Sequence, residues 1–163
     1  KGLEDAVAVA SALGDRLLVW GLIEDQNYAA SVESSVPKGT IDWRGFLPTA
    51  EWQKQLGACR AFINTPKWNE AYGNVVVEAM ACGVPVVAFD RGGPGEIISS
   101  GVTGLLVAPD DIQAMTLATS RISQIDRKEC RRWVEKNASK EIFANRVINW
   151  IVESIQYKKS SLN

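Results

Sequence analysis

Short apolar runs alternate with segments of helical periodicity along almost the whole chain. The runs are four or five residues long and end near Gly, Pro or Asp; they span residues 16–20, 40–43, 61–64, 85–89 and 104–107. Helical spacing of apolar residues covers residues 3–13, 28–35, 49–59, 74–81, 112–122, 128–138 and 143–157. Strands that alternate with helices are typical of a parallel sheet covered on both faces. We therefore predict an α/β fold, a Rossmann-like, doubly wound parallel sheet flanked by helices.

A ligand site is expected at the carboxyl ends of these strands, where doubly wound sheets bind their ligands. The loops after Asn64 and Phe89 lie there, as does the segment before Leu3. The first expected helix begins almost at Lys1, so no strand precedes it to complete a β-α-β unit. We therefore expect a strand, and a partner domain with it, upstream of this chain.

The charge balance excludes several functions. The 18 basic and 19 acidic residues give a formal charge of −1, and the basic residues are scattered, so no positive face for nucleic acid is expected. The longest stretch without a charged residue, 97–109, is shorter than the ~18 residues of a transmembrane helix and contains Gly and Pro. The chain has no histidine, which removes the commonest general base and most zinc sites. Any chemistry must therefore use carboxylates, lysine, arginine and backbone dipoles.

The three cysteines, Cys59, Cys82 and Cys130, are widely spaced and form no C-x-x-C pair. Neither a disulfide framework nor a metal knuckle is indicated. Cys59 and Cys82 lie among apolar and small residues, so we expect them in the core. A reduced, cytoplasmic compartment fits this pattern.

The densest functional signal lies at residues 69–85, which follow an expected strand and open a helix near Gly73 or Asn74. Free N–H groups in the first turn of a helix, with the helix dipole, form an anion site, and glycine lets a ligand approach closely. Glu70 lies in the loop, and Glu78 about one turn inside the helix. Two carboxylates around an anion site would suit a nucleotide sugar, which has hydroxyls at both ends and phosphates between them. Helix capping by the carboxylates and a tight turn at Gly73 are the alternative interpretation.

A second glycine cluster, Gly93-Pro94-Gly95, follows an expected strand and is a candidate for dinucleotide binding. Ile98 occupies the third glycine position of that fingerprint, and Gly101 makes the following helix too short for a crossover. The sequence therefore argues against a dinucleotide-dependent oxidoreductase.

At residues 70–87 the chain reads EAYGNVVVEAMACGVPVV. Here it resembles the retaining, nucleotide-sugar-dependent glycosyltransferases of family four, which have the GT-B fold and carry an E-x7-E motif, represented by Glu70 and Glu78. The resemblance covers nearly the whole chain, and further matching segments lie at residues 1–3, 45–48, 92–98 and 101–107.

The resemblance implies that residues 1–157 form the C-terminal, donor-binding domain of such an enzyme, followed by a polar tail at 158–163. The N-terminal, acceptor-binding domain would be absent from this chain. Glu70 and Lys1 would be the catalytic residues, with Glu70 contacting the transferred sugar and Lys1 stabilising the departing diphosphate. Glu78 would accept hydrogen bonds from the ribose hydroxyls.

The remaining donor contacts implied by the resemblance come from two turns. Backbone N–H groups around Gly73, Asn74 and Val75 would hold sugar hydroxyl and phosphate oxygens, and Tyr72 stands where the family commonly has Phe. The turn formed by Gly45, Phe46 and Leu47 would border the nucleotide base.

The reaction implied is sugar transfer with retention of the anomeric configuration, from a nucleoside diphosphate sugar to an unidentified acceptor. UDP is the expected nucleotide, no further cofactor is implied, and the lack of an Asp-x-Asp motif argues against a bound metal. We expect the chain by itself to bind nucleotide weakly and to transfer no sugar.

A non-catalytic nucleotide-sugar-binding module is the alternative, and a nucleotide-sugar epimerase is disfavoured by the E-x7-E block. The expected location is the cytoplasm, with peripheral membrane attachment through the missing domain left open.

Overall fold

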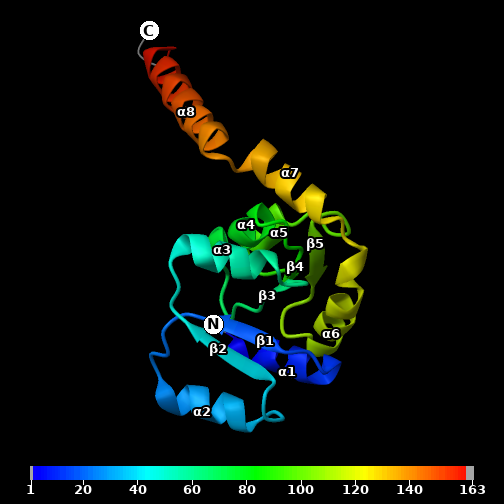
Figure 1. The fold of residues 1–163 in the computed structure, drawn as a ribbon. Helices are drawn as coiled ribbons and strands as arrows, with labels where there is room; N and C mark the ends of the chain where they lie inside the picture. The colour runs from blue at the N-terminus through cyan, green and yellow to red at the C-terminus, as the bar shows by residue number, and fades with distance from the viewer. Residues whose placement is uncertain (1, 161–163) are drawn as a thin grey trace.

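The computed structural model describes residues 2–160, in which helices and strands alternate as the sequence predicts (Figure 1). In chain order the elements are α1 (Leu3–Leu13), β1 (Leu17–Trp20), α2 (Gln26–Ser34), β2 (Ile41–Gly45), α3 (Thr49–Gly57), β3 (Phe62–Asn64), α4 (Asn74–Ala81), β4 (Val86–Phe89), α5 (Gly93–Ile97), β5 (Gly104–Val107), α6 (Ile112–Arg121), a 3-10 turn η1 (Ile122–Gln124), α7 (Arg127–Asn137) and α8 (Lys140–Ser160).

Most helix boundaries agree with the periodicity, and the differences have local causes. Helices α1 and α4 have the bounds that the sequence predicts. Helix α2 begins two residues earlier than expected because Asp25 caps it: its carboxylate accepts a hydrogen bond from the Tyr28 N–H at 2.9 Å. Helix α8 is longer at both ends than the expected helix at 143–157.

The strands are parallel, which confirms the α/β class, but they form two sheets where one was predicted. Strand β1 pairs with β2, and β3, β4 and β5 form a second sheet in that order. Among the described strands, β1 and β3 each have a neighbour on one side alone. Strands β1 and β3 form no backbone hydrogen-bond ladder with each other, so the five strands are divided into two sheets. At the end of β3, the buried side-chain nitrogen of Asn64 finds no hydrogen-bond partner in the described part of the chain.

Two apolar clusters correspond to the two sheets. The larger cluster is built around β4, whose four residues are fully buried, with α4, α6 and α7 packed around it. The smaller cluster consists of Val7, Val32 and Ile41, under β1 and β2. Helix α1 contributes Val9 to the larger cluster and Val7 to the smaller one. It therefore joins the two parts of the molecule.

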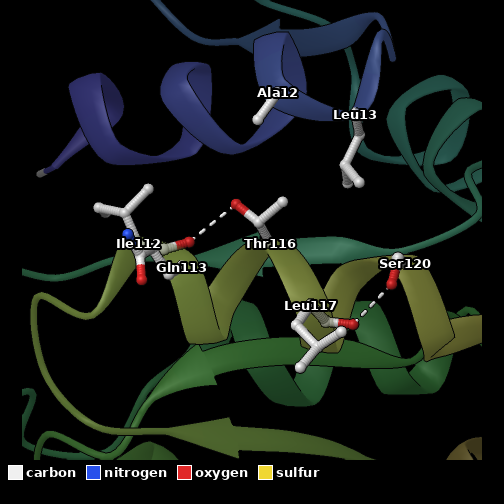
Figure 2. A pocket seen from close by; sticks show the side chains of 7 residues that line it. All are labelled: Ala12, Leu13, Ile112, Gln113, Thr116, Leu117 and Ser120. Carbon is white, nitrogen blue, oxygen red and sulfur yellow. Dashed lines mark hydrogen bonds between the residues drawn. The ribbon is translucent and has the colours of Figure 1, made fainter.

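Helices α1 and α6 pack against each other and leave a shallow apolar groove of about 440 Å³ (Figure 2). The two hydroxyls that line it are already used within α6: Thr116 donates to the Ile112 carbonyl at 2.8 Å and Ser120 to the Leu117 carbonyl at 2.7 Å. This groove therefore offers little for binding a polar ligand.

Helix α8 follows α7 after a short turn and extends beyond the rest of the molecule (Figure 1). It carries a set of large exposed apolar side chains: Phe143, Val147, Ile148, Trp150, Ile151, Val152, Ile155 and Tyr157. No helix within residues 2–160 is sufficiently long and apolar to span a bilayer.

The cysteines differ partly from expectation. Cys130 is buried, whereas Cys59 and Cys82, predicted to be core residues, are half-buried. Both lie just after the last residues of helices, α3 and α4, where the chain turns near the surface. Burial raises the pKa of all three thiols, that of Cys130 to about 11, and this keeps them protonated at neutral pH.

Candidate functional site

Helix α4 begins at Asn74, immediately after Gly73, as the sequence predicts. Gly73 is buried and has a φ of 89°, a left-handed conformation that favours glycine. Its carbonyl accepts the Val76 N–H at 2.9 Å, and within the described residues no side chain caps the helix. The N–H groups of Asn74 and Val75, with the dipole of α4, are therefore available to an anion.

Side-chain caps are present on three helices, α2, α6 and α7, and are lacking at the described start of α4. Asp25, Asp111 and Asp126 cap α2, α6 and α7 through hydrogen bonds to first-turn N–H groups. Helix α1, like α4, follows a left-handed glycine, Gly2, without a side-chain cap from the described residues. Helices α3 and α5 also begin without a side-chain cap from the described residues. Of these four helices, α1, α4 and α5 follow the expected ligand loops.

Glu70 is held in position by its backbone. Its N–H donates to the Arg91 carbonyl at 3.2 Å, and its carbonyl accepts the Gly93 N–H at 2.7 Å, so the loop before α4 pairs with the loop after β4. Glycine is needed at both contact points: a Cβ atom at Gly92 would lie 2.4 Å from the Glu70 carbonyl oxygen, and one at Gly93 2.2 Å from that of Tyr72. Gly92 and Gly93, the second of which opens the Gly93-Pro94-Gly95 cluster, therefore support the loop that carries Glu70.

The two carboxylates of the E-x7-E pair are free. Glu70 is half-buried and Glu78 is exposed on α4, and neither carboxylate receives a hydrogen bond or an ion pair from any described residue. A capping role would require an N–H donor, which neither has. Both can therefore accept hydrogen bonds from ligand hydroxyls.

A groove of about 620 Å³ runs between the first turns of α4 and helix α8. Three predicted donor-binding residues line it: Tyr72, Asn74 and Glu78. Its volume lies within the range of small-molecule sites. Arg146 and Trp150 on α8 line the opposite side, and sequence reasoning missed them. They lie about 70 residues from Glu78, and no motif around them marks a ligand site.

The predicted base-binding turn lies at the end of β2, beside the end of β1, where the Gly21 N–H donates to the Gly45 carbonyl at 2.9 Å. Gly45 has a φ of 64°, Phe46 is 76% exposed and Leu47 is half-buried. None of the three lines the groove beside α4. The predicted Lys1 lies outside the described residues.

Among residues 2–160 there is no group of three or more His, Cys, Asp or Glu side chains that could hold a metal ion.

Known proteins resemble this chain in sequence and in fold. The family described as "Glycosyl transferases group 1" matches residues 1–140. A D-inositol 3-phosphate glycosyltransferase of Saccharomonospora viridis is 34% identical over 109 residues, which are 66% of this chain and 25% of the relative.

Two solved structures share the fold. Anabaena HepE in complex with UDP-glucose superposes with a TM-score of 0.80 at 21% identity, over 94% of this chain and 45% of that one. The sucrose-phosphate synthase of Thermosynechococcus elongatus superposes with a TM-score of 0.84 at 23% identity, over 96% of this chain and 43% of that one. The chain thus spans about a quarter of the curated relative and less than half of each solved structure. The family match covers most of the sequence, and the chain belongs to the group 1 glycosyl transferases.

Proposed function

We propose that this chain is the donor-binding domain of a retaining glycosyltransferase that uses a nucleoside diphosphate sugar, with UDP as the nucleotide. The observation that carries the proposal is the uncapped start of α4, with one free carboxylate before it and another one turn inside it. Anabaena HepE, which has the same fold, was solved in complex with UDP-glucose and with UDP, and this supports the choice of nucleotide.

In this proposal each part of the donor meets a different part of the site. Glu78 accepts hydrogen bonds from the ribose hydroxyls, and Glu70 contacts the transferred sugar. The N–H groups of Asn74 and Val75 bind phosphate and sugar oxygens close to Gly73. The turn of Gly45, Phe46 and Leu47 borders the base at the neighbouring strand ends, and Tyr72 lines the groove.

The reaction breaks the bond between the anomeric carbon and the diphosphate oxygen. The acceptor hydroxyl oxygen forms the new bond on the same face, and its proton passes to the departing diphosphate. Negative charge then grows on the diphosphate while the sugar approaches an oxocarbenium ion. Donors that face the leaving group stabilise the transition state more than the ground state. The N–H groups of α4 fill this role together with Lys1, and the proposal assigns no covalent nucleophile and no metal.

We also propose a second domain for the acceptor. The chain matches less than half of each solved structure with its fold, which leaves room for such a domain. We propose a cytoplasmic enzyme in which residues 1–157 close over the donor against that domain.

Glu78→Ala in the full-length protein tests the proposal. Loss of hydrogen bonds to a charged group should weaken UDP-sugar binding by about 1.5–3 kcal/mol, roughly a 10- to 150-fold rise in Kd. Isothermal calorimetry with UDP-glucose measures this change, and GDP- and ADP-glucose test the choice of base. Glu33→Ala, which removes an exposed carboxylate from α2, is the matched control and should leave the Kd unchanged. Equal donor affinity in wild type and Glu78→Ala would contradict the role of Glu78.

A non-catalytic binding module would bind the donor but produce no glycoside. Nuclear magnetic resonance of the anomeric proton distinguishes the two functions in the full-length protein and reports the stereochemistry directly. An α-configured product from an α-configured donor is the expected result. A β-configured product would refute retention, and donor binding without any product, across acceptors of several classes, would favour the binding module.

A further inference from the structure

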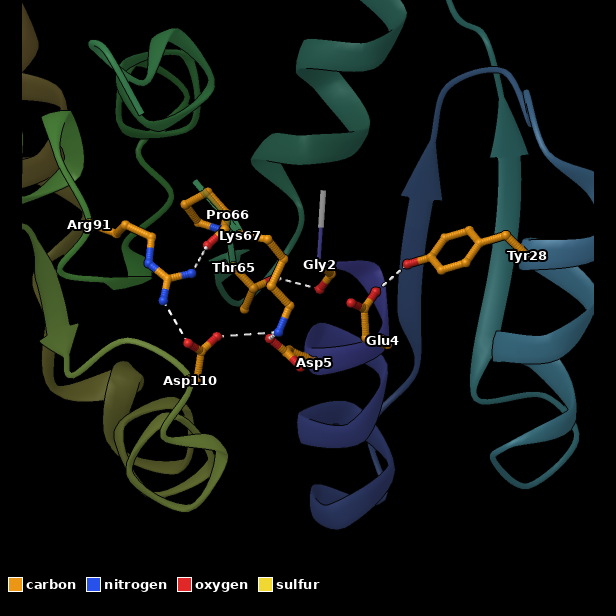
Figure 3. A network of polar contacts seen from close by, with 9 residues as sticks. All are labelled: Gly2, Glu4, Asp5, Tyr28, Thr65, Pro66, Lys67, Arg91 and Asp110. Carbon is orange, nitrogen blue, oxygen red and sulfur yellow. Dashed lines mark hydrogen bonds and ion pairs between the residues drawn. The ribbon is translucent and has the colours of Figure 1, made fainter. Parts of the chain in front are cut away.

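The loop after β3 contacts three other segments of the chain through three consecutive residues (Figure 3). Thr65 donates its hydroxyl hydrogen to the Gly2 carbonyl at 2.7 Å, at the start of α1. The Pro66 carbonyl accepts a hydrogen bond from Arg91, after β4, at 2.9 Å. Lys67 forms ion pairs with Asp5 in the first turn of α1 and with Asp110 after β5.

This arrangement leaves little freedom to the start of α1. A Cβ atom at Gly2 would lie 1.9 Å from the Thr65 carbonyl oxygen, so the helix start rests directly on the loop. Arg91 is 17% exposed and also pairs with Asp110 at 2.6 Å. The uncapped first turn of α1 is therefore fixed relative to the loop that leads to Glu70 and α4.

The charges in this network have an electrostatic consequence for the site. Glu4 and Asp5 place two carboxylates in the first turn of α1, where they oppose an anion at its free N–H groups. The Tyr28 hydroxyl holds the Glu4 carboxylate through a hydrogen bond that lowers its pKa. Lys67 compensates the charge of Asp5 and shares Asp110 with Arg91, and hydrogen bonds to these carboxylates raise the pKa of Lys67. The charges of Asp5, Asp110, Lys67 and Arg91 sum to zero, and the charge of Glu4 is additional. Without Lys67, one further negative charge remains uncompensated.

We propose that Lys67 is a positioning residue for the diphosphate of the donor. It ties the first turn of α1 to the loops after β3 and β5 and compensates the negative charge of Asp5, which would add to the repulsion of the phosphates there. The inference rests on the proposed function, since it presupposes a nucleoside diphosphate beside α1 and α4. Lys67 acts through Asp5 and Asp110 and does not itself bind the donor.

Calorimetry on the full-length protein with UDP and UMP tests the inference, because UMP lacks the distal phosphate. Lys67→Met should weaken UDP binding about fivefold and UMP binding less than twofold at low salt, with the difference shrinking as salt screens the charges. Lys67→Arg, which keeps the charge, should stay within about twofold of wild type for both ligands. Lys54→Met, which removes an exposed lysine from α3, should change neither affinity.

A second variant separates charge from folding. Asp5→Asn in the Lys67→Met background removes the unpaired carboxylate and should restore UDP affinity to within about twofold of wild type. Equal losses for UDP and UMP, no loss for either, or no recovery in the double variant would overturn the role of Lys67. Absence of UDP binding by the wild-type protein would instead overturn the proposed function, and this inference with it.

Discussion

Gly93 lies where the loop after β4 crosses the loop that leads into α4, and the two backbones touch there. A Cβ atom would meet the Tyr72 carbonyl oxygen at 2.2 Å, and that atom cannot move without displacing the loop between Glu70 and Gly73. Gly93→Ala in the full-length protein should therefore lower the free energy of unfolding by about 1–3 kcal/mol. It should also weaken UDP-sugar binding, since Glu70 and the start of α4 shift with the loop. Urea denaturation and calorimetry measure the two effects.

Gly57→Ala is the matched control for Gly93→Ala. Gly57 is the last residue of α3, and a Cβ atom there would make an ordinary contact at 3.7 Å with the Cys82 carbonyl oxygen. Alanine should leave stability unchanged or raise it by up to ~1 kcal/mol, because glycine loses more backbone entropy on folding. Equal free energies of unfolding and equal donor affinities in the two variants would show that the contact at Gly93 has no steric importance.

At the scale of single elements, the sequence predicts helices and strands well where periodicity and punctuation agree. The bounds of α4 follow from Gly73 and the apolar spacing behind it. Strand β4 is fully buried, so its side chains show no alternation of apolar and polar residues. Pro85 before it and the Asp-Arg-Gly-Gly turn after it are the features that identify it as a strand. Contacts between distant segments leave no such pattern. Neither the tie between Lys67 and Asp5 nor the place of Arg146 opposite Glu78 has a sequence signal, because both arise when separate elements pack.

Asn74 is the first residue of α4, where a carboxylate would have opposite effects on stability and on binding. In Asn74→Asp the added charge interacts favourably with the helix dipole, worth ~0.3–1 kcal/mol. The same charge occupies the anion site and should weaken UDP binding about threefold to tenfold. In the full-length protein, the melting temperature should therefore rise, while the affinity for UDP measured by calorimetry should fall.

Gln26→Asp places the same side chain at the first position of α2, a helix already capped by Asp25. It should leave UDP affinity at the wild-type value, because no residue of α2 lines the groove beside α4. If Asn74→Asp bound UDP as tightly as Gln26→Asp does, the start of α4 would not hold the diphosphate.

At the scale of the whole molecule, two surfaces are uncovered in the described part of the chain. One is formed by the open edges of β1 and β3, and the other by the exposed apolar side chains of α8. Strands β1 and β3 show one open edge each among the described strands, and the side-chain nitrogen of Asn64 is buried there without a described partner. A doubly wound sheet places its first strand between its second and fourth strands, which correspond by order to β1 and β3. A strand from upstream of α1 would therefore join the two sheets, and the second domain would cover the apolar residues of α8. With such a strand, the two sheets of this chain would be parts of the single sheet that the pattern predicts.

Hydrogen–deuterium exchange on the full-length protein and on this 163-residue chain tests that arrangement. Amides at residues 17–20 and 62–64 should exchange more slowly in the full-length protein, because an added strand pairs with backbone groups that are open here. Amides at 143–157 should be protected as well, since burial of the apolar side of α8 opposes its local unfolding. Strand β4 is paired on both sides in this chain, so its amides serve as the internal control. Equal exchange of β1 and β3 in the two proteins would show that nothing lies between the sheets, and the two-sheet arrangement would then be the complete one.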